Sequence, residues 1–244
     1  VTGRFTREWL ESVRRWALFA WLFLGAGILM GAWWAYLELG WGGYWAWDPV
    51  ENSSLIPWLT GTALLHSLMM QERRDTFRQW NLWLIGATFL LCLFATFVTR
   101  SGAVQSVHAF GLSSLGNYFI GFILLLLAIQ VYLLHKRRQQ INMPQEVGAL
   151  LSREASLLLT NLLFVGAAGI VLLGILFPTL ARAIQGREIS LGAAFYERTV
   201  GPLAQIIVLV IGVCPWLPWG GMKSGALWRR LLPATLAALG VVVA

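Results

Sequence analysis

The chain has 244 residues, of which 58% are hydrophobic and only 12% are charged. The charged share is about half that of a soluble domain, which excludes an ordinary water-soluble globule and indicates a membrane protein. The net charge of +7 gathers beside apolar runs, so we interpret it as membrane topology and expect no nucleic-acid partner.

Uncharged runs of spanning length recur along the chain. A hydrocarbon core of roughly 30 Å needs about 20 helical residues, and backbone groups in lipid must bond within their own segment. Six runs satisfy this: 16–37, 53–70, 80–99, about 117–134, and stretches within 155–181 and 199–222. We therefore predict an all-α fold, a polytopic transmembrane helical bundle in which 1–244 form a single membrane domain.

The last apolar run, 231–244, has 14 residues and reaches only about 21 Å as a helix. We expect about six full spans plus a truncated seventh, within a part of a larger protein. Cys92 and Cys214 form no C-x-x-C or C-x-x-C-H pattern, which argues against a dithiol redox enzyme and against covalently attached haem.

The basic residues predict which way each loop faces. With the segment before the first span placed inside, the inner segments carry four, three, four and three basic residues, 14 of the 18 in the chain. By the positive-inside rule, loops 38–52, 100–116 and 177–198 then face outward, which in a bacterium is the periplasm. We expect the inner (cytoplasmic) membrane as the location, with membrane lipid as a partner.

The first outer loop contains the stretch WGGYWAWDPVEN, residues 41–52. Its acidic part predicts a helix start, with Asp48 as N-cap, Pro49 at the first helical position and Glu51 three residues after the cap. In this interpretation both carboxylates only stabilise the positive end of the second helix. The cap does not explain the aromatic residues around it.

Aromatic rings crowd this end of one hairpin more densely than an interfacial belt requires. The rings belong to Trp33, Trp34, Tyr36, Trp41, Tyr44, Trp45, Trp47 and Trp58. Gly40, Gly42 and Gly43 interleave them and would let the backbone run close beneath a flat object. If residues 41–48 turn helically, Trp41, Tyr44, Trp45 and Asp48 share a face. We favour a platform for a large planar ligand over a belt alone.

Two histidines lie where a haem ligand could. His66 is inside the second predicted span, where an ionisable residue indicates function, and imidazole is a common ligand of haem iron. His108 lies in the outer loop after the third span, on the side of the aromatic loop. The alternatives are a histidine bonded to a neighbouring helix and a solvated loop histidine. The two residues are too far apart in depth to share one iron. His135 is expected to be a surface residue.

The stretch WGGYWAWDPVENSSLIPWLTGTALLHSL resembles the tryptophan-rich WWD signature of haem-handling membrane proteins. It is most similar to the CcmF family of cytochrome c haem lyases and to its NrfE-like relatives. The resemblance continues through TRSGAVQSVHAF and, more loosely, through GAAFYERTVGPL.

The resemblance implies that the aromatic loop presents haem on the periplasmic side. The implied haem-binding residues are Trp41, Gly42, Gly43, Tyr44, Trp45, Trp47, Asp48, Pro49, Glu51 and Asn52. It also implies that His108 is an axial ligand of this haem and that His66 is a ligand of a separate, permanently bound haem b. The family's other histidine of each pair finds no match here, because none precedes residue 66 and His135 does not fit. Trp45, Trp47 and Asp48 are expected to serve catalysis by positioning.

The implied reaction adds the cysteine thiols of an apocytochrome c C-x-x-C-H motif to the haem vinyl groups. The implied partners are the haem chaperone CcmE, a CcmH-type apocytochrome-handling subunit and apocytochrome c, with quinol as an electron source for haem b. No hydrolase set of residues is present. Two other classes stay open: a haem carrier without ligation activity (CcmC-like), and an ion-coupled transporter in which Asp48 and Glu51 form a cation site.

Overall fold

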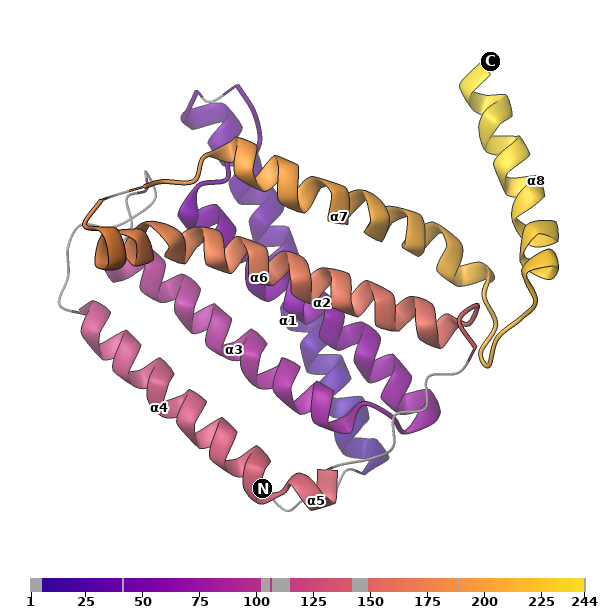
Figure 1. Ribbon diagram of the computed structural model, residues 1–244, viewed down its shortest axis with the longest axis horizontal. Coiled ribbons are helices and arrows are strands. Elements are labelled where there is room, and N and C mark those ends of the chain that lie inside the picture. The colour runs from indigo at the N-terminus through magenta and orange to yellow at the C-terminus, as the bar shows by residue number, and fades with distance from the viewer. Residues whose placement is uncertain are drawn as a thin grey trace.

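A computed structural model describes residues 6–40, 42–101, 106, 115–141, 149–187 and 189–243 (Figure 1). The long helices are α1 (Arg7–Glu38), α2 (Pro49–Arg74), α3 (Arg78–Ser101), α4 (Leu115–Lys136), α6 (Arg153–Gln185), α7 (Ala193–Val213) and α8 (Ser224–Val243). The short ones are α5 (Arg138–Ile141) and the 3₁₀-helix η1 (Cys214–Trp216). The described part of the chain contains no strand, which confirms the prediction of an all-α helical bundle.

Helix α2 lies at the centre of the arrangement. Helices α1, α3 and α6 pack against it, α4 packs against α3, and α7 packs against α6 (Figure 1). Helix α8, yellow in the figure, stands apart and contacts η1. Apart from α8, each long helix therefore packs either against α2 itself or against a helix that contacts α2.

The helices differ in how well they could cross a membrane alone. Among the described residues, α1, α3, α4, α6 and α7 are long and apolar enough to do so. Helix α2 has 26 residues, about 39 Å of helix, but is too polar to be one of them. More than half of its residues are buried by its neighbours, so its surface meets protein rather than lipid.

Side-chain hydrogen bonds join α2 to α1 and α3. The donor–acceptor pairs are Trp21 Nε1 with Thr62 Oγ1 at 2.7 Å, Thr88 Oγ1 with Thr60 Oγ1 at 2.9 Å, and Asn81 Nδ2 with Gln71 Oε1 at 2.6 Å. Between spanning helices such bonds add specific adhesion that apolar packing against lipid-like surfaces cannot supply. They explain why polar residues occur in a segment that the sequence predicts as a span.

Some element boundaries differ from the predicted ones. Helix α6 continues past Pro178 and ends at Gln185, where Gly186 adopts a left-handed conformation with φ 66°. The predicted outer loop 177–198 therefore begins within α6 and ends within α7. Helix α7 begins before residue 199. Helix α8 has 20 residues because 224–230 are helical too, which makes it longer than the 14-residue run from which a short segment was predicted.

Buried Glu154 holds together the end of the bundle where α1 begins and α2 ends, which we call the basic end. Its Oε1 accepts from Arg74 Nη2 at 2.8 Å and from Arg74 Nε at 3.0 Å. The backbone N–H of Gly220 lies 2.9 and 3.1 Å from its two carboxylate oxygens. One carboxylate therefore ties the end of α2, the start of α6 and the segment after η1 to each other.

We expect Glu154→Ala to destabilise the protein by about 1–3 kcal/mol, because the Gly220 N–H would be left without its acceptor and Arg74 without its partner. The melting temperature in detergent, followed by thiol-dye fluorescence, should fall by several degrees. Glu197→Ala, which removes an exposed carboxylate from α7, is the control and should leave it unchanged. Equal melting temperatures for the two variants would contradict this role.

Candidate functional site

The start of α2 is built as the acidic residues predict. Asp48 is the N-cap and its Oδ2 accepts from the Val50 N–H at 2.9 Å. Glu51 reaches back, and its Oε2 accepts from the N–H groups of Ala46 at 3.0 Å and Asp48 at 3.2 Å. Pro49 occupies the first helical turn, which confirms the predicted cap. The two carboxylates thus bind both the helix end and the loop before it.

Residues 42–48 form an irregular loop rather than a helical turn. The predicted common face of Trp41, Tyr44, Trp45 and Asp48 is therefore wrong for the described residues, and Trp41 itself lies outside them. The physical reason is the cap: an N-cap residue has extended backbone, here φ −61° and ψ 145° at Asp48, so the chain before it cannot continue the helix.

Trp47 has an unusual backbone conformation. Its φ of 59° lies in the left-handed region, where a bulky residue rarely occurs without compensation. Buried Asn52 supplies part of that compensation by donating from Nδ2 to the Trp47 carbonyl at 2.9 Å. The Trp47 indole stacks on Tyr196 of α7, with centroids 5.0 Å apart and planes at 6°. The Trp45 ring stands perpendicular to Trp47 at 6.0 Å.

Tyr196 can lie beneath Trp47 only because α6 carries a glycine at this level. Tyr196 is 2% exposed, and a Cβ atom on Gly174 would come within 2.5 Å of its hydroxyl oxygen. A Cβ atom does not approach a non-bonded heavy atom this closely, so any side chain at position 174 would push the tyrosine away. The position of Trp47 therefore depends on three segments: the loop itself, α6 and α7.

Asp48 also links the two predicted outer loops. Ser106 donates from its hydroxyl to Asp48 Oδ2 at 2.6 Å. Ser106 belongs to the stretch TRSGAVQSVHAF and precedes His108 by two residues. The predicted ligand His108 lies outside the described residues.

The remaining rings of the region are largely exposed. Trp33, Trp34, Tyr36 and Tyr44 are all exposed, and Tyr36 stacks on Tyr44 with centroids 4.5 Å apart. A mostly apolar hollow of about 290 Å³ lies between α1 and the start of α2. Its lining includes Trp34, Trp45 and Glu51, together with Gly27 and Gly31 of the G-x-x-x-G pattern in α1. No atom of the described residues lies within 4 Å of a Cβ built on either glycine, so neither glycine serves a close helix contact within that part of the chain.

His66 lies elsewhere on the same helix. It follows Asp48 by 18 residues, so it is about 27 Å farther along α2. Its ring packs against Phe164 of α6, with ring centroids 5.9 Å apart, and its buried Nδ1 has no hydrogen-bond partner among the described residues.

No three His, Cys, Asp or Glu side chains of the described residues gather as a metal site. His135, at the end of α4, is exposed, in agreement with its interpretation as a surface residue.

The structure brings Trp45, Trp47, Asp48 and Glu51 together, and it separates them from His66. Tyr196 and Ser106 were not singled out, although both belong to the quoted stretches GAAFYERTVGPL and TRSGAVQSVHAF. All three stretches that carry the resemblance therefore meet at one end of the bundle, which we call the aromatic end.

Comparisons with known proteins decide the family. Residues 2–105 match the family model described as "Cytochrome C assembly protein". The chain is 43% identical over 242 residues to the cytochrome c-type biogenesis protein CycK of Bradyrhizobium diazoefficiens, covering 99% of this chain and 37% of that protein. It is 43% identical over 244 residues to the cytochrome c-type biogenesis protein CcmF of Pseudomonas aeruginosa, with 99% and 37% coverage.

The chain belongs to the CcmF/CycK/NrfE family. Its fold also matches the solved structure of "Cytochrome c Heme Lyase CcmF", with a TM-score of 0.74 and 36% identity. That match covers 96% of this chain and 35% of the other. The chain thus spans little more than a third of the length of these relatives, and it is a multi-pass membrane segment of a protein family of cytochrome c biogenesis.

We expect Gly174→Ala to displace Tyr196 and to loosen the support of Trp47. Gly169→Ala on the same helix is a matched control, because a Cβ there meets nothing within 4 Å and alanine favours a helix over glycine by about 1 kcal/mol. The melting temperature should fall for Gly174→Ala and stay level or rise for Gly169→Ala. If both variants were equally stable, Tyr196 would not be held as described.

Proposed function

We propose that this chain carries the haem-presenting part of a cytochrome c haem lyase. The observation that supports it best is the convergence at the aromatic end: Trp47 stacks on Tyr196, and Asp48 binds Ser106. These contacts unite the three stretches on which the family resemblance rests. The relative of known structure is named as a haem lyase, which agrees with this assignment.

In this proposal haem is the substrate, and the aromatic loop orients it. Trp45 and Trp47 present two indoles at 90°, one of them fixed from beneath by Tyr196. The hollow beside Trp45 offers apolar walls to part of a flat ring system. Each cysteine thiol of the apocytochrome adds across a vinyl double bond: sulfur bonds to one carbon, the thiol hydrogen goes to the other, and no electrons are gained or lost overall. The contribution of the loop is proximity and orientation.

Asp48 and Glu51 act in this proposal as positioning residues. Their oxygens accept hydrogen bonds from backbone N–H groups and from Ser106, so they hold the loop, the helix and the second outer segment in register. The same bonds speak against the ion-coupled transporter, because a cation site needs carboxylate oxygens turned toward the ion.

His108 is the proposed axial ligand of the transferred haem. Its segment is tied to the aromatic loop through Ser106, two residues earlier in the chain. With the loop facing the periplasm of a bacterial inner membrane, haem would arrive from CcmE, and a CcmH-type subunit would offer the apocytochrome. The multi-subunit reaction is a property of the whole protein, of which this chain is a part.

His66 is the proposed ligand of a resident haem b. A half-buried imidazole whose buried Nδ1 lacks a hydrogen-bond partner in the described part of the chain, next to Phe164 and within a helix packed against three others, suits such a role. The second axial ligand would come from other residues of the protein. When bound, this group would supply electrons, from quinol in our proposal, that keep the substrate iron ferrous.

A haem carrier without ligation activity is the second candidate. It would use the same aromatic loop and His108, but it would need no haem within the membrane. The position of His66, well inside helix α2, favours the lyase, because a histidine at that depth has no task in a carrier that works only at the surface.

We expect His108→Ala in the full-length protein to lower haem attachment by at least about tenfold, since an axial ligand positions the reacting haem. The measurement is haem-stained c-type cytochrome in cells that lack the native lyase. His135→Ala is the control, because it removes an exposed histidine from α4, and it should mature cytochromes normally. Normal maturation by His108→Ala would refute the ligand assignment.

His66→Ala should affect the b-type absorption spectrum, which His108→Ala should leave intact. We expect the b-type Soret and α bands of the dithionite-reduced, detergent-purified protein to fade, whereas His108→Ala should retain them. Phe164→Leu keeps an apolar side chain against position 66 and should shift the bands without abolishing them. A full b-type spectrum in His66→Ala would remove this residue from the haem site and favour the carrier.

A further inference from the structure

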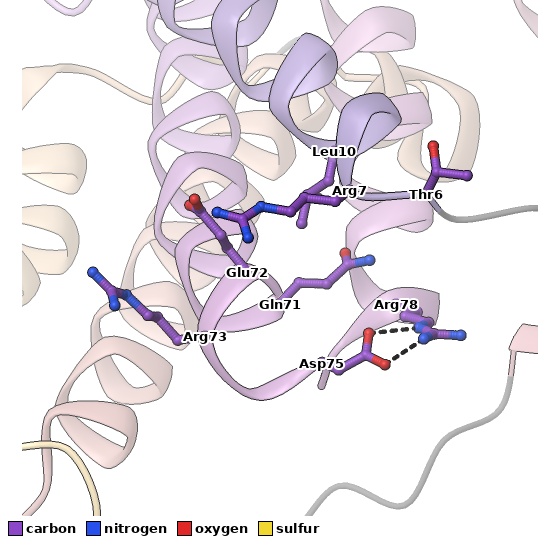
Figure 2. A pocket seen from close by; sticks show the side chains of 8 residues that line it. All are labelled: Thr6, Arg7, Leu10, Gln71, Glu72, Arg73, Asp75 and Arg78. Atoms are coloured by element: carbon purple, nitrogen blue, oxygen red, sulfur yellow. Dashed lines mark hydrogen bonds and ion pairs between the residues drawn. The ribbon is translucent and has the colours of Figure 1, made fainter.

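A polar cavity of about 520 Å³ lies at the basic end, far from the aromatic loop (Figure 2). It is open to the outside and is lined by the first residues of α1 and by the corner that joins α2 to α3. Its lining includes the guanidinium groups of Arg7, Arg73 and Arg78 and the carboxylates of Glu72 and Asp75. Nothing in the proposed haem chemistry uses this cavity.

Both cavity carboxylates already have partners. Arg78 binds Asp75 through Nε and Nη2, and Arg14, which lies outside the lining, binds Glu72. Arg7 pairs with exposed Glu11 at 3.0 Å. Among the described residues no carboxylate pairs with Arg73. The cavity therefore keeps an uncompensated positive charge, next to the positive end of the α1 dipole.

A buried amide adds a directed donor. Gln71 is 5% exposed, and its Oε1 accepts from Asn81 Nδ2 at 2.6 Å. Because the oxygen is turned to Asn81, the amide nitrogen is the group left to donate. Figure 2 shows the Gln71 side chain extending into the cavity between Arg7 and Asp75. Guanidinium groups together with an amide N–H are donors suited to phosphate oxygens.

The surface above the cavity is apolar and exposed. Leu18 follows Arg7 by 11 residues and Leu29 follows Leu18 by 11, about three helical turns each, so the three residues lie along one face of α1. Leu18 is 51% exposed and Leu29 is 73% exposed. An amphiphile whose charged group sits in the cavity could lay its hydrocarbon chains along this face, within the membrane.

We propose that the cavity binds the phosphate-bearing headgroup of an anionic phospholipid. The bound lipid would fill the space between the start of α1 and the α2–α3 corner. Since α1 packs chiefly against α2, the lipid would brace the base of a helix that has few other contacts in the described structure. The inference does not depend on the haem lyase proposal.

The test uses the full-length protein, purified in mild detergent, with phosphatidylglycerol adducts counted by native mass spectrometry. Arg7→Gln combined with Arg73→Gln should reduce the retained lipid by about tenfold, since each basic residue near a headgroup contributes to binding. Lys223→Gln combined with Arg229→Gln removes the same charge from two exposed positions near and on α8, and should retain lipid as the unmodified protein does.

Two further arms identify the ligand. Phosphatidylcholine, which has a phosphate but no net charge, should be retained less than phosphatidylglycerol. Inorganic phosphate at millimolar concentration should not displace the lipid; if it does, the ligand is free phosphate and the lipid assignment is wrong. Equal lipid retention by the cavity variant and the α8 variant, or no retention by the unmodified protein, would also overturn the proposal. Because all four substituted side chains are exposed, each variant should fold.

Discussion

The reciprocal hydrogen bonding of Asp48 and Glu51 is the interaction on which the aromatic end depends. A helix N-terminus needs acceptors for its free N–H groups, and these two side chains supply them. Here they do more, because Glu51 also binds Ala46 within the loop and Asp48 also binds Ser106 from the next outer segment. A local requirement of helix termination thereby fixes the position of Ser106, 58 residues farther along the chain, relative to the aromatic loop.

The rigidity of that arrangement comes from α2. A helix this polar would be poorly placed in lipid, yet α1, α3 and α6 surround it and satisfy part of its polar groups. Burial also removes the freedom of α2 to shift along its axis, since the Thr60, Thr62 and Gln71 contacts fix its register against two neighbours. The loop at one end and Glu154 at the other are then held by the same central element.

The sequence predicts the elements and the cap well, because both follow from local rules. Uncharged runs of about 20 residues give helices, and the order Asp-Pro-x-Glu gives the start of α2. It predicts the loop conformation poorly. The left-handed backbone of Trp47 depends on Asn52 and on the stack with Tyr196, which is 149 residues away in the chain. No pattern near Trp47 contains that information, and the space for Tyr196 depends on Gly174 of a third segment.

The two proposed haem sites share one structural element, because the aromatic loop leads into α2 and His66 lies on α2. The aromatic loop begins where α2 begins, and His66 lies on the same helix about 27 Å away. A helix packed on three sides transmits a displacement along its axis better than a flexible loop, which would absorb it. Changes in the packing of α2 against α3 or α6 should therefore disturb both places together, even though no side chain contacts both. The distance between the proposed substrate site and the proposed site of the resident group is thus set by the length of one helix, and its constancy by the three helices that pack against it.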